Sequence, residues 1–186
     1  METIALDGGF GDAPQEAACA FRKVLSTLAR PGRIETVAGA APPPPVSVAA
    51  GVVLLTLCDP DTPLHLGPSR DQAAVRDWIR FHTGAPLVSA REAMFALGTW
   101  AELNLDDFLI GTPEYPDRSA TLIVECDTLS GAGASLRGPG IETTHTLSLP
   151  EIDAFQRNAA LYPLGLDFLF TCADRIAGLP RSTRVS

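Results

Sequence analysis

The sequence ends with a short group of residues whose types could bind an anion. Arg181-Ser-Thr-Arg184 sets two guanidinium groups and two hydroxyl groups directly after an expected strand. Guanidinium groups form charge-assisted, often paired hydrogen bonds with carboxylates and phosphates. Arg181, Ser182 and Thr183 are therefore candidate ligand-binding or interface residues. A solvated tail is the alternative, because chain ends are commonly loose and polar.

A second candidate group lies around residue 80. Helical spacing places His82 at the end of an inward-facing stripe, where it could act as a general acid or base, or be a core histidine satisfied by one hydrogen bond. The other members of this stripe are Val75, Trp78 and Ile79. Arg76 and Arg80 form a separate basic edge that could meet phosphate or a partner's carboxylates. Arg80, His82 and Thr83 complete the candidate set, but no nucleophile, base and orienting group come together, so we assign no catalytic residue.

Residue counts exclude two kinds of cofactor site. The four cysteines are far apart in the sequence, which excludes a zinc ribbon or an iron–sulfur cluster built from local cysteines. Lys23 is the only lysine, and it falls off the inward stripe of its helix. A Schiff-base enzyme needs a desolvated lysine in its cleft, so we expect no pyridoxal phosphate. We expect no metal and no other cofactor.

Two further motifs have structural explanations. Asp59 and Asp61 could bind a metal, but their position in a proline-bracketed turn is better explained by local hydrogen bonds to the backbone. The glycine-rich residues 129–140 resemble a phosphate loop only superficially, because the GxxxxGK[ST] pattern and a following helix are missing. Strands joined by glycine turns fit this segment better.

Composition narrows the class of protein. A chain of 186 residues is expected to form a single domain, residues 1–186, with a sizeable core. The net charge of −8 argues against nucleic-acid binding. Only 19% of the residues are charged, which favours a subunit with a partner and, in isolation, a homodimer. The longest apolar run, Val48–Cys58, is too short to cross a bilayer, and no leader opens the chain, so we expect a cytoplasmic protein.

The run from Asp167 to Cys172, DFLFTC, is expected to be the central strand. It is apolar and rich in aromatic residues, which is typical of a strand buried on both faces, with Phe168 and Phe170 in the core. A turn at Ala173-Asp174 and an antiparallel partner over 175–179 complete a hairpin before Pro180.

Helices and strands alternate in the rest of the chain. Helices are predicted to begin at the capping residues Asp12, Ser47, Ser69 and Ser148. The first is expected to bury Ala17, Phe21, Val24, Leu25 and Leu28, and the last Ile152, Phe155 and Ala159. Strands are predicted over 33–37, 64–66, 94–98, 119–126 and 142–147, and residues 100–116 stay unassigned. The order predicts an α/β fold, a layered mixed β-sheet flanked by helices.

Several blocks of sequence resemble one known family. They are FRKVLSTLARPG (21–32), VLLTLCDPDTPL (53–64), RFHTGAPL (80–87), TLIVECDTLSG (121–131), LRGPGI (136–141) and PLGLDFLFTCADRIAGLPRSTRV (163–185). In this order they resemble the PhnH family, a component of the bacterial carbon–phosphorus lyase system. The proline run 42–45 and residues 100–116 do not match with it.

The resemblance implies a role in cytoplasmic phosphonate catabolism, within a core complex with the G, I and J subunits. That complex, with an L subunit, is associated with coupling alkylphosphonate to ATP with loss of adenine, which gives ribose 1-alkylphosphonate 5-triphosphate. The radical chemistry that later breaks the carbon–phosphorus bond belongs to the J subunit. The implied fold is similar to the large domain of PLP-dependent transferases without the lysine that holds the cofactor, which agrees with the lone Lys23.

Three functions stay open at this point. The first is an accessory subunit of the phosphonate complex without catalysis of its own, which the lack of a catalytic set of residues favours. The second is an enzyme subunit whose site uses Arg80, His82, Arg181 and Ser182 on a phosphorylated nucleotide. The third is a PLP enzyme, which the lysine count nearly excludes.

Overall fold

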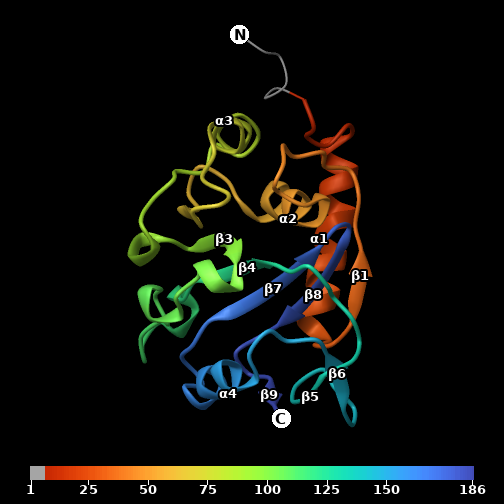
Figure 1. Cartoon of the computed structure of the whole chain (residues 1–186), viewed down its shortest axis with the longest axis vertical. Helices are drawn as coiled ribbons and strands as arrows, with labels where there is room; N and C mark the ends of the chain where they lie inside the picture. The colour runs from red at the N-terminus through yellow and green to blue at the C-terminus, as the bar shows by residue number, and fades with distance from the viewer. Residues whose placement is uncertain (1–6) are drawn as a thin grey trace.

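The computed structural model describes residues 7–186, and its centre is a six-stranded sheet in the order β1-β8-β7-β4-β3-β2 (Figure 1). Strands β2, β3, β4 and β7 are parallel, whereas β8 is antiparallel to β7 and β1 is antiparallel to β8. The bounds are β1 Ile34–Thr36, β2 Leu64–Leu66, β3 Phe95–Thr99, β4 Thr121–Glu125, β7 Asp167–Cys172 and β8 Arg175–Leu179.

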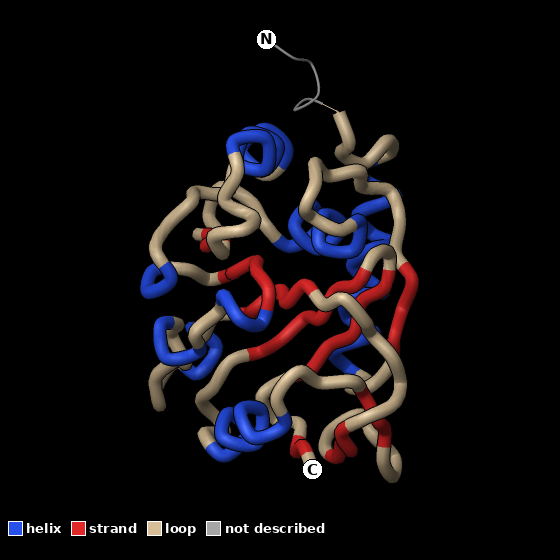
Figure 2. The backbone as a smooth tube through the Cα atoms, viewed as in Figure 1, coloured by secondary structure: helices blue, strands red, loops and turns tan. Residues whose placement is uncertain are grey.

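Helices pack on both faces of this sheet. One core joins the sheet to α1 (Ala13–Ala29), α2 (Val48–Leu57) and α3 (Ala73–His82). The other joins it to α4 (Ile152–Ala160) and to a small sheet of order β6-β5-β9, with bounds β5 Ala134–Arg137, β6 His145–Leu147 and β9 Arg184–Val185. Figure 2 shows the strands crossing the middle of the molecule between these groups of helices. The predicted layered mixed sheet flanked by helices is confirmed.

Strand β7 is buried on both faces, as predicted. Phe168 and Phe170 lie in the core shared with α4, and Leu169 lies in the core shared with α1–α3. The ring of Phe155 on α4 packs edge-on against Phe168, with centroids 5.0 Å apart. The predicted hairpin to β8 is also confirmed, and Ala173 in its turn has a left-handed φ of 53°.

The prediction of which face of α1 is buried is wrong at its two largest positions. Phe21 and Leu25 are 49% and 52% exposed, whereas Ala20, Val24 and Thr27 face the core. The reason is the close approach of α1 to β8, where a Cβ atom on Gly178 would lie 2.8 Å from the backbone of Thr27. Only small side chains fit at this contact, so the helix turns its large ones outward.

The start and the buried face of α4 also differ from the prediction. The helix begins at Ile152 rather than at Ser148, and Ile152 is exposed. Its buried residues are Ala154, Phe155 and Asn158. The Asn158 amide donates to the Leu166 carbonyl oxygen at 2.9 Å and accepts from its N–H at 2.8 Å. Asn158 can be buried although it is polar, because its side chain pairs with the backbone of Leu166, directly before β7.

Of the predicted capping residues, only Ser47 acts as one, with its Oγ accepting from the Ala50 N–H at 3.1 Å. Asp12 makes no side-chain cap, and its own N–H donates to Glu16. Ser69 does not cap α3, because its N–H and hydroxyl both donate to Glu102. The predicted local role of Asp59 is confirmed, since its Oδ1 accepts from the Asp61 N–H at 2.9 Å.

The unassigned residues 100–116 lie mostly in loops and single turns of 3₁₀ helix. These turns are η3 Trp100–Glu102 and η4 Leu105–Asp107, and η2 Ala90–Glu92 and η5 Pro116–Arg118 lie on either side. Turns of three residues have no repeating apolar face, which is why periodicity could not assign them.

Candidate functional site

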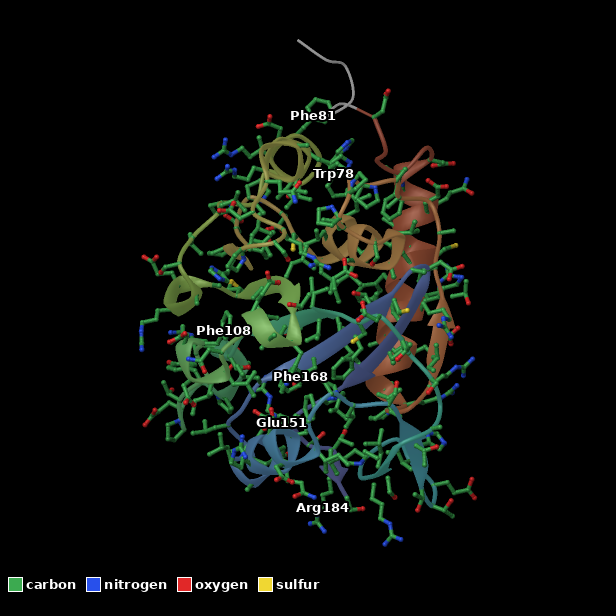
Figure 3. All side chains as sticks on the ribbon, in the orientation of Figure 1. Trp78, Phe81, Phe108, Glu151, Phe168 and Arg184 are labelled. Carbon is green, nitrogen blue, oxygen red and sulfur yellow. The ribbon has the colours of Figure 1, made fainter. Side chains whose placement is uncertain are left out.

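The two candidate groups lie at opposite ends of the molecule. Arg80, His82 and Thr83 are at the carboxyl end of α3, near the labelled Phe81 (Figure 3). The other group is at the chain's end, next to the labelled Arg184 at the bottom of the same view. The structure does not bring these two groups into one site.

Four of the five N–H groups of the Arg181 guanidinium donate to partners from the chain itself. It donates to both oxygens of Asp167, at 3.2 and 2.5 Å, to the Pro116 carbonyl oxygen at 2.5 Å and to the Ser119 hydroxyl. Only 14% of its side chain is exposed. Arg181 therefore binds an anion, as its type suggests, but that anion is the carboxylate at the start of β7.

The neighbours of Arg181 offer little to a ligand. Thr183 is buried, and its hydroxyl has no hydrogen-bond partner among the described residues. Ser182 borders a shallow hollow of about 340 Å³ that Arg181, Tyr162 and Asp167 also line. Because Asp167 already neutralises Arg181, this hollow has no free positive charge from the pair.

His82 and Thr83 have structural contacts at the end of α3. The His82 ring packs at a tilt of 52° against Trp78, with centroids 5.0 Å apart, and its Nε2 lies 3.3 Å from the carbonyl oxygen of Asp7. The Thr83 hydroxyl donates to the Ile79 carbonyl oxygen at 2.8 Å and accepts from the Ala85 N–H at 3.1 Å. These contacts hold the amino-terminal loop and end the helix. His82 is only partly buried and lines a pocket of about 400 Å³ with Gly9 and Phe10, so the structure does not place it in the core.

Arg80 instead lines a small pocket between α3 and the edge strand β2. The pocket has a volume of about 270 Å³, and His65, Asp71 and Arg76 also contribute side chains to it. Arg76 lies 3.3 Å from Asp71. The sequence indicates the basic edge of Arg76 and Arg80, but it assigns His65 only to a strand. Nothing in the sequence alone places that strand beside α3.

Glu102 is a hydrogen-bonded carboxylate that the sequence did not single out. It lies beyond β3 and accepts from the N–H and hydroxyl groups of both Ser69 and Thr99, at 2.7 to 2.9 Å. Partial burial acts to raise the pKa of Glu102, but these hydrogen bonds outweigh it and lower the pKa to about 2. The carboxylate joins the loops that follow β2 and β3.

A second carboxylate, Glu125, occupies the carboxyl end of β4. It is buried and accepts from the Ser47 N–H at 2.8 Å and from the Thr171 hydroxyl at 3.2 Å. The positive end of the α2 dipole favours a negative charge at this position. Ligands of open α/β sheets usually bind at the carboxyl ends of parallel strands. Here Glu102 and Glu125 take up that edge with internal hydrogen bonds.

The cysteines and the lysine do not form a reactive centre. Burial raises the pKa of Cys126 to about 12, and the nearby Cys172 adds to the effect. Burial likewise raises the pKa of Cys58 to about 12, so neither thiol is an activated nucleophile. The Lys23 ammonium donates to the Thr36 carbonyl oxygen at 2.5 Å. Within residues 7–186, no three His, Cys, Asp or Glu side chains are grouped as metal ligands, and no helix is long and apolar enough to cross a membrane.

An open apolar groove lies between α4 and the loops of residues 100–110. Its volume is about 650 Å³, and its apolar lining includes Trp100, Leu105, Ile110, Leu161 and Leu166. The Trp100 indole N–H donates to Glu151 at the rim at 3.3 Å. Leu161 in the groove lining is 46% exposed. Phe21 and Leu25 form a second exposed apolar surface, the α1 stripe.

The comparisons with known proteins agree on one family. Residues 8–186 match the family described as "Bacterial phosphonate metabolism protein (PhnH)". A relative from Rhizobium meliloti (strain 1021), named alpha-D-ribose 1-methylphosphonate 5-triphosphate synthase subunit PhnH, is 40% identical over 96% of this chain and 94% of its own. Another from Stutzerimonas stutzeri, named putative C-P lyase subunit protein HtxG, is 30% identical over 96% and 95%. The chain belongs to the PhnH family of bacterial phosphonate metabolism proteins.

Proposed function

We propose that this chain is a non-catalytic subunit of a cytoplasmic carbon–phosphorus lyase core complex, with the G, I and J subunits as partners. In it the chain supports the formation of ribose 1-alkylphosphonate 5-triphosphate from ATP and alkylphosphonate. The family membership and the names of the two relatives support this role. The proposal includes one domain over residues 1–186 and a fold akin to the large domain of PLP-dependent transferases without their cofactor.

The observation that carries the proposal is the exposed apolar surface. Leu161, which lines the groove, is 46% exposed, and Phe21 and Leu25 on α1 are 49% and 52% exposed. Contiguous apolar patches on a protein surface usually mark interaction sites. By contrast, the carboxyl edge of the sheet, where an α/β enzyme would bind its substrate, is filled by Glu102 and Glu125.

The two apolar surfaces suit different partners. The α1 stripe lies along one helix, so a second copy of the same stripe can pack against it about a twofold axis, which is the commonest symmetry of homo-oligomers. The groove is concave and needs a convex occupant from another protein. We assign the α1 stripe to the homodimer of the isolated chain and the groove to the J subunit.

The test combines light scattering with co-purification. Wild-type protein is expected to be a dimer and to co-purify with the J subunit. Phe21→Glu should give a monomer that still binds J, because a buried charge opposes packing of the stripe. Leu161→Glu should keep the dimer and weaken J binding at least about tenfold, equivalent to about 1.4 kcal/mol. Met94→Glu is the matched control, since Met94 is exposed and lies in neither surface.

The alternative function is an enzyme subunit with its own nucleotide site around Arg80, His82 and Arg181. The distance between the two ends of the molecule opposes a single site that contains Arg181 and α3. Purified protein supplied with ATP and methylphosphonate should therefore turn over neither. A monomer that consumes both unaided would defeat the subunit proposal.

A further inference from the structure

The pocket between β2 and α3 concentrates positive charge in an acidic protein. The chain carries a net charge of −8, yet the charged residues that line this pocket are two arginines and one aspartate, Arg76, Arg80 and Asp71. Asp71 is 3.3 Å from Arg76 and pairs with it. One positive charge, that of Arg80, is therefore in excess within the lining.

The two arginines also repel each other unless something lies between them. They are four residues apart on α3, so both side chains project from the same side of the helix. Like charges at this spacing destabilise a helix. An anion held between the two guanidinium groups removes this cost and gains paired, charge-assisted hydrogen bonds.

His65 adds an oriented polar group from the strand side. Its Nδ1 lies 3.2 Å from the Val88 carbonyl oxygen, which can only accept, so Nδ1 carries the proton. The ring is held edge-on against Phe108, with centroids 5.9 Å apart. In this tautomer Nε2 is the acceptor nitrogen, so it can accept a hydrogen bond from a hydroxyl group of a ligand. Leu66 and Leu87 line the pocket with apolar carbon atoms.

One feature of α3 opposes an anion at this place. Arg80 is in the last turn, where the negative end of the helix dipole favours a cation. That end is equivalent to about half an elementary charge, which is less than the charge of one guanidinium. Two arginines with a single paired aspartate still leave the pocket positive.

We propose that this pocket binds a tetrahedral phosphorus oxyanion, the phosphate or phosphonate group of a small molecule. Arg76 and Arg80 hold the ionised oxygens, His65 Nε2 accepts a hydrogen bond from the protonated oxygen (P–OH) of the monoanion, and Leu66 and Leu87 contact the organic substituent. This site is distinct from the carboxyl end of the chain, and it does not depend on assembly with other subunits. The isolated chain can therefore test it whether or not the subunit proposal holds.

The experiment is isothermal titration of the purified full chain with inorganic phosphate, methylphosphonate and ATP at constant ionic strength. We expect saturable binding of at least one of the three, and the preferred anion identifies the source of the phosphorus group. Arg80→Ala and Arg76→Ala should each weaken binding about tenfold or more, the loss of one charge-assisted contact. His65→Phe, which keeps a ring next to Phe108, should weaken it less.

Arg91→Ala is the matched control, because Arg91 is 77% exposed and lies 3.8 Å from Asp107, outside the pocket. It should bind like wild type. Thermal unfolding confirms that each variant folds, which is expected because Arg80 and Arg91 are both exposed. The proposal is overturned if none of the three anions binds, or if Arg76→Ala and Arg80→Ala bind as tightly as Arg91→Ala does.

Discussion

Replacing Glu102 by glutamine removes one charge and leaves the shape of the side chain nearly unchanged. The carboxylate accepts four hydrogen bonds from Ser69 and Thr99, and its side chain is only 18% exposed. The lowering of its pKa from 4.5 to about 2 corresponds to about 3 kcal/mol of stability at neutral pH. Glu102→Gln should therefore lower the free energy of unfolding at pH 7 by up to about 3 kcal/mol.

The stability difference between wild type and Glu102→Gln should shrink as the pH falls. A carboxyl group whose pKa is lower in the folded protein stabilises it fully above pH 4.5, and the stabilisation is lost as the pH falls toward 2. Wild type should therefore lose its advantage over Glu102→Gln across this interval. Urea unfolding at a series of pH values from 7 to about 2.5 measures the difference.

The matched control is Glu142→Gln, since Glu142 is exposed in the loop before β6. Its free energy of unfolding should differ from wild type by less than about 0.5 kcal/mol at every pH. The reasoning is refuted if Glu102→Gln differs from wild type by the same amount at pH 7 and at about pH 2.5, or if it is as stable as the control at pH 7.

Three further outcomes are expected. Phe168→Ala and Phe170→Ala should each lower the free energy of unfolding by about 3–5 kcal/mol in chemical denaturation, because both rings are fully buried; a loss below about 1 kcal/mol for both would contradict the core assignment. Incubation with pyridoxal phosphate should give no saturable aldimine absorbance, because the only lysine, Lys23, donates to the Thr36 carbonyl oxygen. An absorbance band that disappears in Lys23→Ala would contradict this. Ala173→Gly should raise the midpoint of urea unfolding. Ala173 has a left-handed φ of 53°, which costs alanine about 1 kcal/mol and costs glycine nothing. A lower midpoint would show that alanine bears no such cost in this turn.

The fold was predictable from the sequence where one physical effect dominates. The run DFLFTC is apolar on both faces, and only a central strand can bury it, so β7 and its hairpin to β8 were predictable. The exposure of the α1 stripe, Phe21 and Leu25, was not predictable. Its helical period was correct, but which side faces inward depends on the close contact of Thr27 with Gly178, which lies near the other end of the sequence.

The sequence predicted which residue types bind anions, but it did not predict which groups of the chain they would bind. The type of Arg181 correctly predicts that it binds an anion, but the anion is Asp167, and the two are separated by 14 residues with no periodic relation. Glu102 was missed although Thr99-Trp-Ala-Glu102 has the spacing of a capping box, which the structure forms, because no helical periodicity follows it. Its partner Ser69 is 33 residues away in the sequence, and only the parallel pairing of β2 and β3 brings the two together.

Several groups of this protein that could bind an anion are already bound to its own carboxylates. Hydrogen-bond donors that could serve an anionic ligand are already bound to the chain's own carboxylates at three places: Arg181 to Asp167, the Ser47 N–H at the start of α2 to Glu125, and the Ser69 N–H to Glu102. Each match uses hydrogen bonds that a substrate would otherwise receive, so these places stabilise the fold rather than bind a ligand. At the β2–α3 pocket, Asp71 pairs with Arg76, and Arg80, which also lines the pocket, is left with no paired carboxylate among the lining residues. An external anion is therefore better accommodated in this pocket than at the three places already neutralised from within.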